Sequence, residues 1–289
     1  MKERTSINPK TGVFALIGNP VSHSMSPAIH NGAFTELNID SIYVAFQVED
    51  VKSALAGMRA LDNFRGMSVT IPHKIEVMQY VDEIPEVDRH IGSINTVVKE
   101  GGKLIGFNTD GPGALKAIVD AGVELSGKKV LMLGAGGAAR AIAFTLAQKG
   151  GIGELVLLDI NEEFLNNLTG DLRNGTDATI TPGALDSFTV EEHMASADLI
   201  INCTPVGMHP NEDATLVPDN LFRPGQVVFD VVYNPLETKL LRQAKAKGLK
   251  VIPGVEMFIN QAILQFERFA GTDAPEELMR NVVMEQLTK

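Results

Sequence analysis

A short run of glycine and alanine, residues 134–139, has the residue types that bring a peptide backbone close to a diphosphate. Its sequence, Gly134-Ala135-Gly136-Gly137-Ala138-Ala139, has the form G-x-G-x-x-A. In this form the first glycine allows a tight turn, the second allows close approach of the backbone, and the alanine keeps the next helix near the strand. An apolar run precedes it and a helical run follows, and helix N-terminal N–H groups bind phosphates. The pattern predicts a dinucleotide site; a glycine-rich turn without a ligand is the alternative.

An aspartate ends the next β-like run along the chain. Asp159 stands where an acidic side chain can hydrogen-bond both hydroxyls of an adenosine ribose. It is followed by Ile160, Asn161, Glu162 and Glu163, so no nearby arginine could bind a 2′-phosphate, which Asp159 would also repel. We therefore predict that the chain prefers NAD to NADP. An exposed aspartate at a strand end is the alternative interpretation.

Three further segments place polar side chains at the ends of β-like runs. They are His23-Ser-Met-Ser-Pro27, Val69-Thr-Ile-Pro-His-Lys74 and Gly106-Phe-Asn-Thr-Asp-Gly111. A dehydrogenase needs a proton donor and acceptor beside the alcohol carbon, and polar groups that hold the substrate for hydride transfer. Because α/β sheets place their sites at strand ends, these segments are candidates for that chemistry.

Strands and helices must position these segments. Up to about residue 122, β-like runs alternate with helical patterns that begin near Ser26 and Asp50, as in the βαβ units of a parallel sheet. Gly101-Gly102 then separates two β-rich runs, which predicts a hairpin before Asp110. The runs that predict the first strands are 13–18, 41–46 and 65–70.

A second βαβ series begins at Lys128, and the C-terminal residues predict helices, the last opened by Pro275. Strands of this series are predicted at 128–133, 154–159, 197–203, 226–232 and 249–253. We predict a two-domain α/β fold. Residues 1–110 with 255–289 would form an α/β substrate domain, and residues 111–254 a Rossmann-like, doubly wound nucleotide-binding domain.

The composition narrows the class of partner. The chain has 289 residues, of which 44% are hydrophobic and 21% charged, so each of two domains could bury its own core. A net charge of -11 argues against binding to nucleic acid or anionic membranes. No apolar run approaches the about 20 residues of a membrane helix. We expect a small-molecule partner and a monomer or homodimer.

The cysteine and histidine content argues against disulfides and metal. Cys203 is the only cysteine, and the first residues lack the apolar run of a signal peptide, so we expect a cytoplasmic protein. The six histidines form no H-E-x-x-H or H-x-x-E-H array. We therefore expect no metal site.

The sequence resembles the shikimate dehydrogenase family, which includes quinate/shikimate dehydrogenases, over nearly its whole length. The N-terminal blocks that carry the resemblance are Gly18-Asn-Pro20, His23-Ser-Met-Ser-Pro27, Ser68-Val-Thr-Ile-Pro-His-Lys74, Gly92-Ser-Ile-Asn-Thr96 and Asn108-Thr-Asp-Gly111. The later ones are Gly134-Ala-Gly-Gly-Ala138, Asn202-Cys-Thr-Pro-Val-Gly-Met208, Asp230-Val-Val-Tyr-Asn-Pro235 and Gly254-Val-Glu-Met-Phe-Ile-Asn-Gln261. So many blocks in one order are far more specific than any one of them.

The resemblance implies a catalytic pair, Lys74 and Asp110. An ammonium group can donate a proton to a ketone oxygen as hydride arrives, and a nearby carboxylate can orient it or relay protons. Taken alone, the two residues could equally be a surface ion pair, which contributes little to stability.

The resemblance also implies the substrate contacts. Ser24 and Ser26 correspond to serines that bind the substrate carboxylate, although helix capping is an alternative role and Ser26 could have both. The ring hydroxyls would be bound by Thr70, Asn95, Asp110 and Gln261, with Tyr233 as another substrate contact. Val231 and Gly254 resemble positions that flank the nicotinamide.

The chain departs from the commonest family pattern after the second strand of the nucleotide domain. Many NADP-dependent members have Asn-Arg-Thr where this chain has Asp159-Ile160-Asn161. This supports a preference for NAD and leaves open whether the enzyme works in aromatic amino acid biosynthesis by the shikimate pathway or in quinate breakdown. Two other classes stay open: a non-catalytic nucleotide sensor, and another two-domain dehydrogenase acting on a folate or an amino acid.

Overall fold

The computed structural model describes residues 6–288 and divides into two compact units, each described here by itself. The first unit contains the chain up to Thr109 and from Gln261 on, and the second contains Asp110–Asn260. The long helix α9 (Gly254–Ala270) contributes residues to both units.

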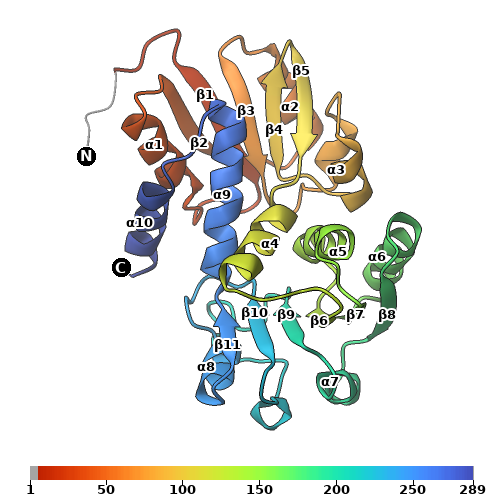
Figure 1. Ribbon diagram of the computed structural model, residues 1–289. Helices are drawn as coiled ribbons and strands as arrows, with labels where there is room; N and C mark the ends of the chain where they lie inside the picture. Colours follow the sequence, from red (N-terminus) through yellow and green to blue (C-terminus); the bar gives the residue numbers. More distant parts are fainter. Residues whose placement is uncertain (1–5, 289) are drawn as a thin grey trace. The chain divides into compact units, whose positions relative to one another are not determined.

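The first unit is built on a five-stranded mixed sheet with the order β2-β1-β3-β4-β5 (Figure 1). The first three strands are parallel, and β4 and β5 run antiparallel to their neighbours. The strands are β1 (Gly12–Gly18), β2 (Ser41–Gln47), β3 (Phe64–Val69), β4 (Thr96–Glu100) and β5 (Lys103–Phe107). The three predicted strands and the hairpin are confirmed, each within one residue of the predicted bounds. Gly101 and Gly102 form the hairpin turn with φ of 56° and 81°.

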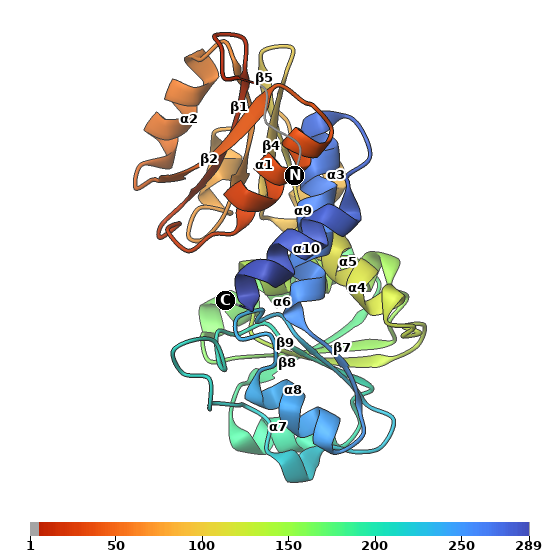
Figure 2. The ribbon, with the colours of Figure 1, turned by 90° about the vertical axis from the view of Figure 1, so that its left-hand side faces the viewer.

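Helices cover both faces of this sheet. Figure 2 shows α2 on one side and α1, α9 and α10 on the other. Val51 and Leu55 of α2 pack against Ile17 and Val69, whereas Phe34 of α1 stacks on Phe14 at 5.2 Å between ring centroids. The helices are α1 (Ser26–Glu36), α2 (Val51–Ala60), the 3₁₀ helix η1 (Glu76–Gln79), α3 (Glu86–Ile91), α9 and α10 (Glu276–Leu287).

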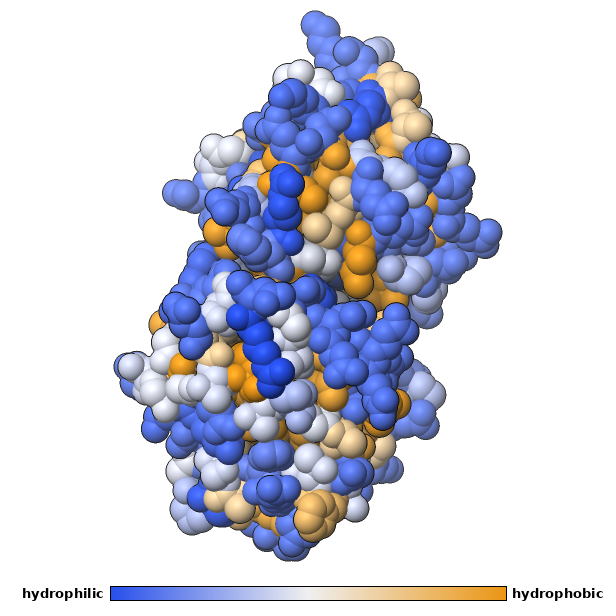
Figure 3. Space-filling model, turned by 90° about the vertical axis from the view of Figure 1, so that its right-hand side faces the viewer, coloured by the Kyte–Doolittle hydropathy of each residue, from blue (hydrophilic) through white to orange (hydrophobic). Residues whose placement is uncertain are grey.

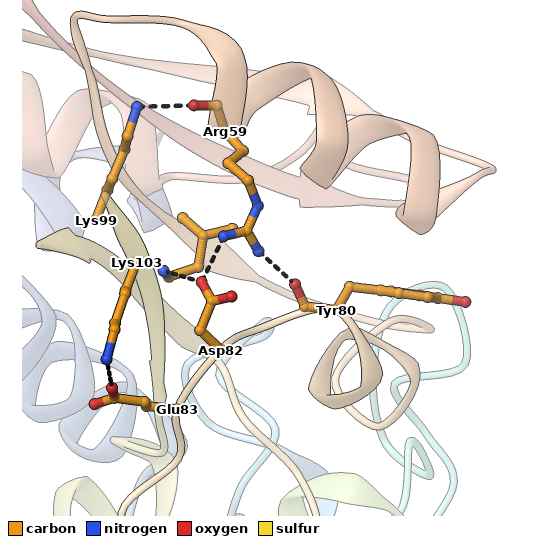
Figure 4. Close-up of polar contacts among 7 residues, drawn as sticks. Arg59, Tyr80, Asp82, Glu83, Lys99 and Lys103 are labelled. Carbon is orange, nitrogen blue, oxygen red and sulfur yellow. Dashed lines mark hydrogen bonds and ion pairs between the residues drawn. The ribbon is translucent and has the colours of Figure 1, made fainter. Parts of the chain in front are cut away.

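Charged side chains fix the hairpin to the rest of the first unit (Figure 4). Asp82 accepts a hydrogen bond from the Leu104 N–H at 2.7 Å and pairs with Arg59, whose hydrogen bond lowers the pKa of the Asp82 carboxyl. Lys103 pairs with Glu83 beside it. The segment around Asp82 thereby lies along the outer strand β5.

The second unit has a six-stranded parallel sheet with the order β11-β10-β9-β6-β7-β8. This order confirms the doubly wound fold, and it reverses between β6 and β9, where such sheets bind ligands. The strands are β6 (Lys129–Leu133), β7 (Glu154–Asp159), β8 (Thr179–Ala184), β9 (Leu199–Asn202), β10 (Val227–Asp230) and β11 (Lys250–Ile252). The helices are α4 (Asp110–Asp120), α5 (Gly137–Lys149), α6 (Glu162–Gly175), α7 (Ser187–Met194), α8 (Lys239–Ala246) and the 3₁₀ helix η2 (Asp219–Leu221).

The central strands of this sheet are apolar on both faces because helices cover both. Leu131, Val156 and Ile200 are fully buried. Strand β8 was not among the predicted strands. It is an edge strand and contains Pro182, which cannot donate to a neighbouring strand and is tolerated only at such an edge.

Apolar side chains are in small groups between hydrophilic ones on the face drawn in Figure 3. Within residues 6–288, no helix combines the length and the apolar character needed to cross a membrane.

Candidate functional site

The glycine-rich turn lies at the switch point of the second unit's sheet. Gly134 has φ of 104°, and a Cβ atom there would lie 3.1 Å from the backbone carbon of Cys203. A side chain is therefore excluded both by backbone conformation and by the neighbouring strand. At Gly136 and Gly137 a Cβ would meet no atom within 4 Å, so that side of the turn is open.

Helix α5 begins at Gly137 with Gly136 as its N-cap and no acidic residue in its first turn. Its N-terminal N–H groups therefore keep their partial positive charge for an anion. Ala135 is buried behind the turn, and Ala138 is the second residue of α5. These residues fit a nucleotide diphosphate, because added side chains at Gly136 and Gly137 would occupy the space that it needs.

Asp159, at the end of β7, contacts this turn directly. Its Oδ2 accepts a hydrogen bond from the Ala135 N–H at 2.5 Å, and its Oδ1 accepts one from the Asn161 N–H at 2.7 Å. Ile160 is 83% exposed beside it. The nearest basic side chain on α5, Arg140, pairs with Asp171. The Asp159 carboxylate is thus bonded to the glycine-rich turn, with the apolar Ile160 side chain next to it.

A buried polar network joins the ends of β9 and β10. Asp230 accepts hydrogen bonds from Asn202 Nδ2 at 2.9 Å, from the Val232 N–H at 3.1 Å and from Thr238 Oγ1 at 2.6 Å. Burial is the largest influence on this carboxyl and raises its pKa to about 6. The network holds the segment that contains Val231.

Tyr233 and Gly254 lie on either side of that segment. The Tyr233 ring stacks on Phe258 at 4.5 Å, and burial raises the pKa of its hydroxyl. A Cβ at Gly254 would lie 2.4 Å from the Val231 carbonyl oxygen. Gly254 is therefore required for α9 to start against this backbone, a packing role that is independent of any cofactor.

In the first unit, the predicted serines lie at the start of α1. Ser24 Oγ accepts a hydrogen bond from the Ser26 N–H at 3.2 Å, so Ser24 satisfies an N–H group at the helix start. Ser26 is buried, with 8% of its surface exposed. Both follow the carboxyl end of β1.

Thr70 and Lys74 follow the carboxyl end of β3. The Thr70 N–H donates to the Ile17 carbonyl at 2.9 Å, and the Ile94 N–H donates to the Lys74 carbonyl at 2.9 Å. His73, between them, donates from Nε2 to the Val48 carbonyl at 2.7 Å. The backbone around Lys74 is therefore anchored to neighbouring loops while its half-buried side chain can serve a substrate.

Asn95 precedes the antiparallel strand β4, which brings it to the same end of the sheet. Its Nδ2 donates to Thr109 Oγ1 at 2.9 Å, and its Oδ1 accepts from the Thr109 N–H at 2.9 Å. These bonds fix the residue directly before Asp110. Asp110 is 5% exposed and begins α4.

The structure thus gathers two sets of predicted residues, one in each unit. Ser24, Ser26, Thr70, Lys74 and Asn95 lie at one end of the first sheet. Gly134 to Ala138, Asp159 and Val231 lie at the carboxyl end of the second. Lys74 and Gln261 belong to the first unit and Asp110 and Tyr233 to the second, so the catalytic pair stays a prediction.

Residues that the sequence analysis missed connect the predicted ones. Ser68 Oγ donates to Gln265 Oε1 at 2.8 Å, and Gln265 Nε2 donates to the Asn95 carbonyl at 3.2 Å. In the sequence, Ser68 and Gln265 are each a polar residue within an otherwise apolar run. That pattern is the sign of a buried polar contact that the sequence offers.

In the described part of the chain, no group of three or more His, Cys, Asp or Glu side chains is placed to hold a metal ion. Burial raises the pKa of the Cys203 thiol, which makes it a poor nucleophile.

Comparison with known proteins identifies relatives over nearly the whole chain. Residues 16–97 match the family model "Shikimate dehydrogenase substrate binding domain", and residues 254–284 match "Shikimate 5'-dehydrogenase C-terminal domain". The "Shikimate dehydrogenase (NADP(+))" of Moorella thermoacetica is 42% identical over 97% of this chain and 95% of its own length.

Two solved structures resemble this one closely. Shikimate 5-dehydrogenase from Listeria monocytogenes, in complex with shikimate and NAD, has a TM-score of 0.90 at 34% identity and covers 98% of this chain and 99% of its own. Quinate dehydrogenase from Corynebacterium glutamicum, in complex with NAD, has a TM-score of 0.89 at 28% identity, with coverages of 95% and 99%.

Proposed function

Because this chain belongs to the shikimate dehydrogenase family, we propose that it catalyses the reversible, nicotinamide-dependent reduction of 3-dehydroshikimate to shikimate. The observation that carries the proposal is the gathering of Ser24, Ser26, Thr70, Lys74 and Asn95 at one end of the first sheet. This set combines hydroxyls for a carboxylate, an amide for ring hydroxyls and an ammonium for the reacting oxygen.

The first unit binds the substrate and the second binds the cofactor. Support for the second assignment comes from the turn at Gly134 and from the N-terminus of α5, which fit a diphosphate. When bound, the nicotinamide supplies or accepts the hydride at the substrate's ring carbon.

Lys74 and Asp110 move the proton. In the direction of ketone reduction, the Lys74 ammonium donates a proton to the ketone oxygen as it becomes an alcohol. The Asp110 carboxylate orients the ammonium group and, after the transfer, relays a proton from water to the neutral Lys74 amine. Ser24 and Ser26 hold the substrate carboxylate, and Thr70, Asn95 and Gln261 bind the ring hydroxyls. Because a site built for hydroxyls leaves polar groups unpaired with a deoxy analogue, it rejects such an analogue.

The preferred cofactor is NAD. Asp159 at the end of β7 and the exposed Ile160 beside it support this preference, because a 2′-phosphate would meet a carboxylate and no arginine. Relatives such as that of Moorella thermoacetica are named for NADP(+), which does not favour NAD. The neighbours from Listeria monocytogenes and Corynebacterium glutamicum were solved with NAD.

Quinate is the second candidate substrate, favoured by the quinate dehydrogenase among the structural neighbours. Steady-state assays of the purified full chain with shikimate and with quinate, each with NAD and NADP, test these proposals together. We expect the highest kcat/KM with shikimate and NAD. Absence of turnover with both acids would overturn the proposed enzymatic function. A clear preference for NADP would overturn the proposal that Asp159 selects NAD.

A further inference from the structure

Asn202 ends strand β9 at the point where the order of the second unit's sheet reverses. In the sheet it pairs with Leu133, the last residue of β6, and with Asp230, the last residue of β10. Doubly wound sheets bind their ligands at such a point, between the loops that follow the strands. One of these loops is the glycine-rich turn after β6. The other follows β9 and is called here the β9 turn, residues 203–206.

The β9 turn packs directly on the glycine-rich turn. The Cys203 N–H donates to the Leu133 carbonyl at 2.8 Å, which joins the two turns where they leave the sheet. A Cβ atom at Gly134 would lie 3.1 Å from Thr204 Cγ2 and 3.1 Å from the Cys203 carbonyl carbon. Any movement of the β9 turn therefore changes the space beside the backbone that is expected to contact the diphosphate.

The side chain of Asn202 fixes the shape of the β9 turn. Its Oδ1 accepts hydrogen bonds from the Thr204 N–H at 3.1 Å and from Thr204 Oγ1 at 2.7 Å, and its Nδ2 donates to the Val206 carbonyl at 3.2 Å. Thr204 Oγ1 in turn accepts from the Val206 N–H at 3.2 Å. Beyond Cys203 the backbone has left the sheet, and side-chain bonds of this kind set the conformation of a loop.

The same amide connects the β9 turn to the segment after β10. Asn202 Nδ2 also donates to Asp230 Oδ1 at 2.9 Å, and the Val231 N–H donates to the Asn202 carbonyl at 2.9 Å. The Asn202 side chain is 2% exposed, and these bonds use both of its donor hydrogens and both lone pairs of its oxygen. Asn202 therefore acts on a ligand only through the groups that it holds.

We propose that Asn202 is a positioning residue for the nicotinamide cofactor, which holds the β9 turn against Gly134 and ties it to the segment that contains Val231. This inference rests on the proposed function, because it deepens the account of the cofactor site in that reaction. A turn that is held in its bound conformation lowers the cost of ordering it when the cofactor binds. The diphosphate is common to NAD and NADP, so the effect of Asn202 is equal for both, unlike that of Asp159.

The variant Thr204→Val tests the bond between Asn202 and the β9 turn. It removes the hydroxyl that bonds Asn202 Oδ1 and the Val206 N–H, and it keeps a methyl group beside Gly134. We expect the Kd of NAD and the Kd of NADP to rise by the same factor, about three- to tenfold, the size of one or two lost hydrogen bonds. The kcat at saturating nucleotide and the KM of shikimate should stay within about twofold, because the bond from Asn202 to Asp230 remains.

The matched control is Thr215→Val in the same unit. Thr215 Oγ1 bonds to the N–H of Val217 at 3.3 Å and to its carbonyl at 3.4 Å, a similar local contact that does not involve Asn202. The nucleotide affinity of Thr215→Val should be that of wild type. If Thr204→Val lowers only the melting temperature and leaves the Kd of both nucleotides unchanged, the bond has a purely structural role and the inference is wrong.

A double-mutant cycle with Asn202→Ala determines whether Thr204 acts through Asn202 or on the cofactor itself. Asn202→Ala alone should raise the Kd of both nucleotides at least about tenfold, and Thr204→Val should then add less than about twofold. An equal effect of Thr204→Val in both backgrounds would overturn the inference. If Asn202→Ala does not fold, because it leaves polar partners buried without their bonds, the Kd values of Thr204→Val decide alone.

Calorimetric titration of the purified full chain with each nucleotide needs no turnover. Wild-type protein that binds neither NAD nor NADP would contradict the proposed function. Wild-type protein that binds them, together with a Thr204→Val variant that binds them equally well, would contradict the role of Asn202 and leave the proposed function intact.

Discussion

The Oδ2 atom of Asp159 accepts a hydrogen bond from the backbone N–H of Ala135, at 2.5 Å. The residue expected to contact the ribose therefore also fixes the turn expected to contact the diphosphate. A substitution at Asp159 will change both parts of the cofactor site.

We predict that Asp159→Ala raises the Kd of NAD about tenfold and the Kd of NADP by a smaller factor. Both cofactors lose the support that Asp159 gives the turn, but only NADP gains from removal of the negative charge. Calorimetric titration with each nucleotide measures this. The exposed Asp177→Ala, which removes a carboxylate from the loop after α6, is the control. Equal weakening of both nucleotides would contradict the prediction.

Lys74→Ala should lower kcat by at least about a hundredfold while the Kd of the nucleotide stays within about twofold. The fold should persist because the contact that anchors this position is made by the Lys74 carbonyl, which the substitution retains. Steady-state kinetics and nucleotide titration give the two values. Lys52→Ala, at an exposed position of α2, should have wild-type activity. A Lys74 variant with normal turnover would remove Lys74 from the proton-transfer step.

His30 should make the protein less stable in acid. Burial lowers its pKa from 6.5 to about 3, although the neighbouring Gln265 side chain opposes the shift. Below pH 6.5 the unfolded chain binds a proton that folded His30 does not, so the free energy of unfolding falls as pH falls toward 3. The expected slope is about 1.4 kcal/mol per pH unit.

The variant His30→Phe keeps the ring stacking on Tyr43 and removes this titration. Denaturant unfolding should show the stability of His30→Phe relative to wild type rising by about 1 kcal/mol when the pH falls from about 6 to about 5. His90→Gln, at an exposed position of α3, should show no such change. If the difference in the free energy of unfolding between His30→Phe and wild type does not change with pH, His30 is protonated in the folded protein and the prediction is wrong.

Asp230 should stabilise the second unit through its three hydrogen bonds. We expect Asp230→Ala to lower the free energy of unfolding by about 3 kcal/mol, since it leaves buried donors without their acceptor, and Asp230→Asn by about 1 kcal/mol, because an amide oxygen still accepts. Hydrogen exchange at the amides of β9 and β10 measures this locally. Asp213→Ala, whose side chain is fully exposed, is the control. Equal effects of the Ala and Asn substitutions would contradict the role given to these bonds.

The pH dependence of Asp230 has the opposite sign to that of His30. The pKa of its carboxyl is raised from 3.8 to about 6 by burial, so the folded protein binds the extra proton between these values. The contribution of the Asp230 carboxyl to the free energy of unfolding is largest below pH 3.8 and is lost as the pH rises through about 6. The two groups partly cancel in wild type, which is why the His30 prediction compares variants.

The strands that position the site could be predicted because each is a short apolar run between turn residues. The glycine turn could also be predicted, since its function depends on neighbours in sequence. Strand β8 could not, because Pro182 and Gly183 interrupt its run and its place is set by pairing with β7.

The buried polar network could not be predicted from the sequence. Ser68 and Gln265 are distant in the chain, and each lies in a run of apolar residues that predicts a buried strand or helix. Asp230 resembles an exposed residue at a strand end, yet it is fully buried because Asn202 and Thr238 reach it from neighbouring elements. Such pairings depend on register and helix rotation, which local patterns do not specify.

The bonds between the Asn31 side chain and the Tyr43 backbone have a consequence for the first unit's sheet. Strand β2 is at its edge, where unpaired backbone groups could join the strand of another molecule. The Asn31 amide occupies both backbone groups of Tyr43, as a neighbouring strand would. At the opposite edge, the backbone of Glu83 forms a parallel bridge to Ile105 of β5. Both borders of the sheet are thus partly closed to intermolecular strand addition, which protects the chain against edge-to-edge aggregation.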